Sequence, residues 1–122
     1  MMNNEAQGPE FSVSVSKETG SSTIRINGEV DIHTCPKLTL QLNTLISEGQ
    51  NVLIVNLENV HYIDSTGLGT IAHAARNIEQ KNGKMLLISN KPQIKKLFEM
   101  SGLKDKNISL FENESTAKES LS

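Results

Sequence analysis

Apolar and polar side chains alternate along the first part of the chain. The run FSVSVSKE, residues 11–18, has apolar residues at positions 11, 13 and 15, and the run TIRIN, residues 23–27, continues this pattern. A period of two predicts half-buried β-strands, and the short Gly-Ser-Ser turn between the two runs predicts that they form a hairpin. The side chains expected to face inward are Phe11, Val13, Val15, Ile24 and Ile26.

Three later segments have apolar residues at the three- and four-residue spacing of an α-helix. The first begins near Pro36, which suits a first turn, and ends at Gly49. The second runs from Ser65 to the Asn82-Gly83 pair, and the third from Pro92 to the Ser101-Gly102 pair. Their expected buried faces are Leu38, Leu42, Leu45 and Ile46; Leu68, Ile71, Ala72, Ala75 and Ile78; and Ile94, Leu97 and Phe98.

Apolar runs between these helices predict buried strands. NVLIVNL, residues 51–57, is expected to be covered on both faces, and further strands are expected at residues 84–89 and 108–111. Ala117 and Leu121 suggest a short final helix. The order predicts one α/β domain over residues 11–122. Its mixed sheet would have four or five strands, a hairpin plus parallel strands, with residues 1–10 as a disordered leader.

Composition and charge exclude several classes of function. The 122 residues include 12 basic and 14 acidic side chains, for a net charge of −2, and aromatic residues are only 3%. With no basic run, the sequence offers no case for a nucleic-acid partner. A single cysteine, Cys35, excludes an internal disulfide and suits the cytoplasm. No segment approaches the roughly 18 apolar residues that a membrane span needs, so no membrane location is expected.

The segment IDSTGLG, residues 63–69, lies where a strand is expected to give way to a helix. Asp64, Ser65 or Thr66 could each be the cap of that helix. Two glycines in the first turns each cost about 1 kcal/mol relative to alanine, which suggests bare backbone that another surface approaches. Leu68 would then be an exposed apolar knob unless it turns inward. Ligand crevices in such sheets lie at the carboxyl ends of strands, as this segment does.

Catalytic and metal-binding readings of this segment have little support. A serine hydrolase elbow has the pattern G-x-S-x-G, but no glycine precedes Ser65 here. A phosphate-binding loop needs further glycines and a lysine. A phospho-aspartate site at Asp64 would need further acidic metal ligands. The three histidines, His33, His61 and His73, have no spacing typical of a metal site, so we expect no metal, no cofactor and no catalysis.

Modification of a hydroxyl group is the remaining chemistry. A phosphate on Ser65 would meet the positive end of the helix dipole, so the fold should tolerate it. It would nevertheless add a charge of about −1.5 to −2 to an exposed surface. Such a group would repel a partner that presents a carboxylate or an apolar patch there, and would control binding without unfolding the domain.

Three segments together resemble the anti-sigma factor antagonists of the bacterial STAS-domain family. IDSTGLG resembles the signature of that family. NGEVDIHTCPKL, residues 27–38, resembles its G-E-[IL]-D segment, and LFEMSGL, residues 97–103, resembles its L-F-[DE]-[ML]-[ST]-G-L segment. The matches occur in the order of the family and span most of residues 11–111.

The resemblance implies a switch in transcription regulation and stress-response signalling. Family members bind an anti-sigma factor that is also a serine kinase of the GHKL type, and this binding releases the sigma factor. Phosphorylation ends the binding, and a PP2C-type phosphatase restores it. A second reading implied by the family is a STAS-type binding subunit of a transporter or of a larger sensory complex.

The resemblance also assigns roles to individual residues. Ser65 would be the phosphate acceptor, with Thr66 as the alternative. Asp31 would lie beside it in the partner interface, although it could be only a helix cap, and His33 would lie at the rim. The expected partner-binding residues are Asp31, His33, Asp64, Ser65, Thr66, Gly67, Leu68 and Gly69.

Overall fold

The computed structural model describes residues 10–102 and 107–121. The leader expected over residues 1–10 therefore lies, apart from Glu10, outside the described residues, as does Leu103 of the LFEMSGL segment. The elements in chain order are β1 (Ser12–Glu18), β2 (Ser21–Val30), α1 (Cys35–Ser47), β3 (Val52–Ile63), α2 (Ser65–Glu79), β4 (Lys84–Ile88), α3 (Pro92–Met100), β5 (Ile108–Phe111) and α4 (Glu114–Glu119).

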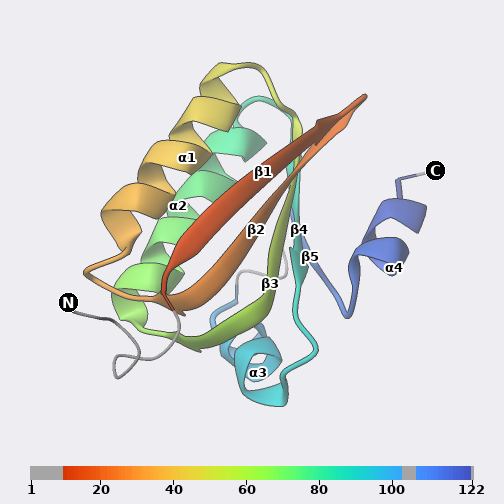
Figure 1. Ribbon diagram of the computed structural model, residues 1–122. Helices are drawn as coiled ribbons and strands as arrows, with labels where there is room; N and C mark the ends of the chain where they lie inside the picture. The colour runs from red at the N-terminus through yellow and green to blue at the C-terminus, as the bar shows by residue number, and fades with distance from the viewer. Residues whose placement is uncertain (1–9, 103–106, 122) are drawn as a thin grey trace.

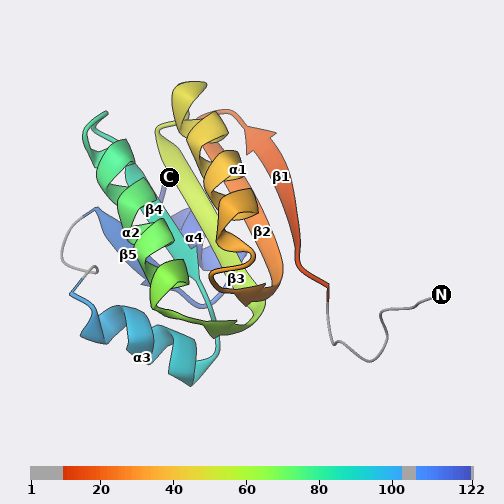
Figure 2. The ribbon, with the colours of Figure 1, turned by 90° about the vertical axis from the view of Figure 1, so that its left-hand side faces the viewer.

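The strands form one five-stranded mixed sheet in the order β1-β2-β3-β4-β5. β1 pairs antiparallel with β2, and the other neighbouring pairs are parallel. Helices α1 and α2 lie side by side on one face of the sheet, and α4 lies on the other (Figure 1). In the view turned by 90°, α3 lies at the end of the sheet where β3 leads into α2 (Figure 2). The predicted α/β class and sheet composition are confirmed.

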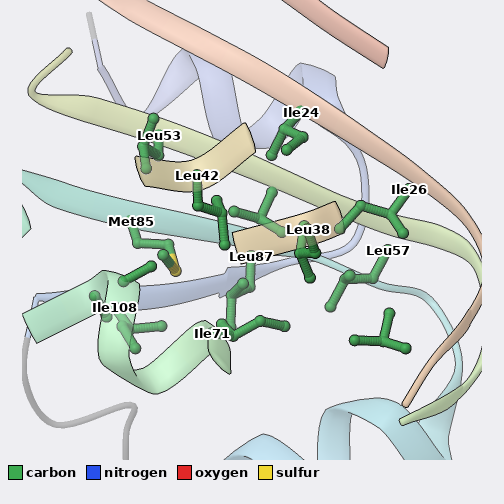
Figure 3. Close-up of a cluster of buried hydrophobic side chains, with 14 of the residues drawn as sticks. Ile24, Ile26, Leu38, Leu42, Leu53, Leu57, Ile71, Met85, Leu87 and Ile108 are labelled. Atoms are coloured by element: carbon green, nitrogen blue, oxygen red, sulfur yellow. The ribbon is translucent and has the colours of Figure 1, made fainter. Parts of the chain in front are cut away.

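The main core lies between the sheet and helices α1, α2 and α3. Alternate residues of the central strands, such as Leu53 and Leu57, face Leu38 and Leu42 of α1 and Ile71 of α2 (Figure 3). A smaller cluster on the opposite face joins the sheet to α4. Both faces of β3 are therefore covered, as the sequence predicted from its nearly continuous run of apolar residues. The smaller cluster comprises Ile54, Leu86, Ile88 and Ala117, with Val52, Phe111 and Leu121 packed against it.

Polar contacts also hold α4 on the sheet. Arg25 of β2 donates two hydrogen bonds to Glu114, at 2.7 Å and 2.8 Å, and the buried amide of Asn56 donates a third at 2.6 Å. The hydrogen bond from Arg25 is the main cause that lowers the pKa of Glu114, while partial burial opposes it. The ionised carboxylate is therefore the form that anchors α4.

Two expectations about the strands need correction. Val15 is 36% exposed, because β1 is the edge strand of the sheet and has a neighbour on one side only. Ser21 and Ser22, which were expected in the turn, instead begin β2 and are buried.

β3 reaches Ile63, where the sequence predicted that a strand gives way to a helix, and its pairing with β2 contains two register shifts. At each shift β3 has one residue more than β2, between Asn56 and Asn59 and between Val60 and Tyr62. Within the described residues, no helix combines the length and the apolar character needed to cross a bilayer.

Candidate functional site

The segment that follows β3 lies beside the loop that follows β2. The two strands are parallel, and Val30 is paired with Ile63 at their carboxyl ends. The backbone N–H of Asp64 donates to the carbonyl of Val30 at 3.1 Å. The topology therefore brings the residues after Val30 and the residues after Ile63 to the same end of the sheet, at the carboxyl ends of β2 and β3, where the sequence predicted the site.

Asp64 is the N-cap of α2 and also binds the neighbouring loop. Its Oδ1 accepts from the N–H of Gly67 at 2.8 Å, and its Oδ2 accepts from the N–H of Ile32 at 3.2 Å. Its backbone is extended, as a cap residue requires. Both carboxylate oxygens are thus used within the protein, so Asp64 fixes the start of α2 relative to the loop between β2 and α1.

Asp31 organises its own loop. Its Oδ1 accepts from the N–H groups of His33 and Thr34 at 2.9 Å and 3.1 Å. The hydroxyl of Thr34 in turn donates to the carbonyl of Glu29 at 2.8 Å. The Asp31 side chain therefore orders the turn before α1 and does not cap the helix itself, whose N-cap is Thr34 without a side-chain cap bond. The loop of Asp31 lies beside Asp64, as the family resemblance implied. His33 is exposed at this end of the sheet.

Gly67 contacts the protein itself, and its expected contact with a partner remains a prediction. It is buried, and a Cβ atom built on it would lie 2.5 Å from the carbonyl oxygen of Val30 and 2.7 Å from Val30 Cγ1. A methyl group cannot occupy that space. The missing side chain lets the first turn of α2 lie directly against the end of β2.

Gly69 has the opposite environment. It is exposed, and a Cβ atom built on it would meet nothing within 4 Å. Leu68, between the two glycines, is half-buried and packs against the main core, so it is not a free apolar knob. Of the three residues, Gly69 alone offers open backbone at the surface.

Ser65 and Thr66 are the first two residues of α2, and both are exposed. Since Asp64 provides the cap, neither hydroxyl is needed for that purpose. Within the described part of the chain, no hydrogen bond links the Ser65 hydroxyl to another residue. The backbone carbonyl of Thr66 accepts from the hydroxyl of Thr70 at 3.0 Å. Both side chains are accessible to another molecule.

The histidines do not join the serine in a catalytic arrangement. His33, His61 and His73 are all exposed, and in the described ranges none of them hydrogen-bonds Ser65. A triad needs a histidine within hydrogen-bond reach of the nucleophile. In the same ranges no cluster of three or more His, Cys, Asp or Glu side chains could hold a metal ion. Cys35 is a free, buried thiol at the start of α1.

Sequence reasoning missed a groove between α1 and α2. It has a cavity volume of about 260 Å³, and Thr66 and Gly69 are among the residues that line it. Its other wall comes from the middle of α1, with Thr39, Leu42 and Asn43. The exposed polar residues of α1 gave no signal of this groove, because it exists only when the two helices pack side by side.

Comparison with known proteins shows the family of this chain. The chain matches the model of the STAS domain over residues 12–117. This chain belongs to the STAS domain family. The STAS domain is similar to the anti-sigma-B factor antagonist of Staphylococcus aureus (strain NCTC 8325 / PS 47), with 37% identity over 82 residues, 67% of this chain and 76% of that protein. The anti-sigma-B factor antagonist of Staphylococcus epidermidis is 35% identical over 82 residues, 67% of this chain and 76% of that protein.

Solved structures share the fold of this STAS domain. The Bacillus cell fate determinant SpoIIAA in its phosphorylated form matches with a TM-score of 0.72 and 25% identity, over 93% of this chain and 100% of that one. An anti-sigma factor antagonist from Mycobacterium paratuberculosis matches with a TM-score of 0.82 and 20% identity, over 91% and 93% of the two chains. The family resemblance drawn from the three sequence segments is confirmed.

Proposed function

We propose that this STAS domain is an anti-sigma factor antagonist that works in the cytoplasm by switching partners. Its unphosphorylated form binds an anti-sigma factor that is also a GHKL-type serine kinase, and so releases the sigma factor. The observation that carries the proposal is the exposed hydroxyl of Ser65, on the first residue of a helix already capped by Asp64. The antagonist relatives supply the class of partner.

The kinase transfers the γ-phosphoryl group of ATP to Ser65 Oγ, a base of the kinase takes the hydroxyl proton, and ADP leaves. The new phosphate lies at the positive end of the α2 dipole, where negative charge is favoured. It does not displace the cap, because the Gly67 N–H is bound by Asp64. The fold is retained, and the change of about −1.5 to −2 in charge acts on the surface that the partner covers.

The surface that the partner covers is expected to consist of the site residues that are exposed and not used in contacts within the domain. Ser65, Thr66 and Gly69 offer exposed groups at the start of α2, and Asp31 and His33 belong to the adjacent loop. Leu68 presents only its exposed part. Asp64 acts by holding the two segments together, and Gly67 by allowing α2 to approach β2. The domain is a substrate of the kinase and of a PP2C-type phosphatase, and it catalyses neither reaction.

Calorimetric titration of the purified anti-sigma kinase of the host organism, loaded with ADP, tests this function. Ser65→Ala should bind as tightly as the unmodified protein, while Ser65→Asp should bind at least about tenfold more weakly. Thr19→Asp is the matched control, because it places the same charge on the exposed turn between β1 and β2, at the opposite end of β2 from this site, and it should bind like the unmodified protein. Mass spectrometry after incubation with kinase and ATP should find one phosphate on Ser65. Equal affinity of the Ser65→Ala and Ser65→Asp proteins would exclude the proposed switch.

A further inference from the structure

The groove between α1 and α2 has a graded lining. Its floor is apolar and buried, made by Leu42 and Ala74, which are 1% and 3% exposed. Thr39 and Thr70 form half-buried walls, and Asn43 and His73 form an exposed rim. Among the described residues that line it, none is Asp, Glu, Lys or Arg. The groove therefore combines an apolar base with uncharged hydrogen-bonding groups above it.

The size of the groove selects the kind of occupant. Its volume of about 260 Å³ lies below the range of about 300–1,000 Å³ typical of pockets for cofactors and drug-sized ligands. With no Lys or Arg in its lining, the groove also offers no permanent positive charge to neutralise a nucleotide phosphate. An uncharged side chain from another protein, with an apolar stem and a polar end, matches both the volume and the lining.

Gly69 gives an independent reason to expect a partner here. Glycine inside a helix costs about 1 kcal/mol relative to alanine, and the packing of this protein does not require it, since a Cβ atom would meet nothing within 4 Å. Gly69 lines the groove, and so does Thr66, the residue after the proposed phosphate acceptor. The groove is therefore continuous with the surface at Ser65, and its glycine leaves room for an approaching molecule.

We propose that this α1–α2 groove receives an uncharged side chain of the anti-sigma kinase and determines which kinase the domain recognises. The inference rests on the proposed function, because the occupant belongs to the same partner. The start of α2 would then carry the charge that switches binding, while the groove would carry selectivity between related partners. Specificity of this kind comes from a pocket whose shape and polar groups fit one partner and exclude another.

Filling the groove from α1 tests the assignment. Asn43→Phe adds a large ring at the rim, and phenylalanine and asparagine have similar helix propensities. Thr44→Phe is the matched control on the adjacent exposed position, which does not line the groove. Titration with the ADP-loaded kinase should show the dissociation constant of Asn43→Phe raised about tenfold or more, and that of Thr44→Phe changed by less than about twofold. Thermal unfolding should confirm that both variants are folded.

Including Ser65→Asp in the same titrations separates the two proposals. If Ser65→Asp abolishes binding while Asn43→Phe binds like the unmodified protein, the groove has no part in recognition and only this inference falls. If the two phenylalanine variants weaken binding equally, the effect is not specific to the groove, and the inference again falls. If the unmodified protein does not bind the kinase, the proposed function and the groove assignment both fail.

Discussion

The inner and outer sides of the first turns of α2 differ in what their residues contact. On the inner side, Asp64 binds both α2 and the loop after β2, and Gly67 lies against Val30. On the outer side, Ser65 is exposed and Gly69 faces open space. Residues that alternate within a few positions of the chain thus divide into a fixed framework and a free surface. This division lets a charge be added outside without disturbing the packing inside.

Gly67→Ala should have the largest effect on the framework. The added methyl carbon would lie 2.5 Å from the backbone oxygen of Val30, so α2 must move away from β2. Overpacking of this kind typically costs 1–3 kcal/mol, and we expect a loss of about 2 kcal/mol in the free energy of unfolding. Urea denaturation measures it. An unchanged urea midpoint would mean that α2 can tilt away from β2 without loss of stability. The packing of Gly67 would then not distinguish the inner side of α2 from its outer side.

Asp64→Ala should have the next largest effect, because it removes the cap and the link to Ile32 together. Loss of an N-cap typically costs about 1 kcal/mol and up to about 2 kcal/mol. Asp64→Asn is the matched variant, since its amide oxygen can still accept from the Gly67 N–H while the carboxylate charge is lost. NMR hydrogen exchange should show the Ile32 N–H exchanging faster in the alanine variant. Protection equal to that of the unmodified protein would show that Asp64 does not hold the loop.

The comparison of the two glycines also shows what sequence reasoning could reach. The order of strands and helices and the position of the junction follow from apolar spacing, and all were confirmed. The two glycines, however, look equivalent in IDSTGLG, since their difference depends on the distance between α2 and the end of β2. The same limit applies to Val15, which has the pattern of an inward residue but lies on an edge strand. In each case the burial of the residue is decided by packing between elements that are distant in the sequence, which the local pattern of apolar residues does not contain.

The pair of Arg25 and Glu114 lies on the opposite face of the sheet from α1 and α2, so a change there should alter stability without altering partner binding. The hydrogen bonds of Arg25 lower the pKa of Glu114 in the folded protein. The pair therefore stabilises the fold above the unfolded pKa, near 4.5, and this stabilisation is lost as the pH falls through the lower folded value. Because the Arg25 side chain is 40% exposed and partly screened by solvent, we expect a contribution of about 1 kcal/mol at pH 7.

Glu114→Gln tests this contribution without touching α2. Urea denaturation at pH 7 should show the variant less stable, and the difference should shrink as the pH is lowered below 4.5. Binding of the anti-sigma kinase at pH 7 should not change. A stability difference that is independent of pH would show that the charge of Glu114 does not anchor α4.

Gly69→Ala should have the smallest effect on stability, and with the opposite sign. The new methyl group meets no neighbour in the protein, so the variant gains helix propensity and should be more stable by up to about 1 kcal/mol. The same methyl group projects at the groove and should weaken binding of the ADP-loaded kinase several-fold. Urea denaturation and calorimetry on one preparation measure both quantities. A variant that is more stable and binds equally well would show that the open backbone at Gly69 does not serve the partner.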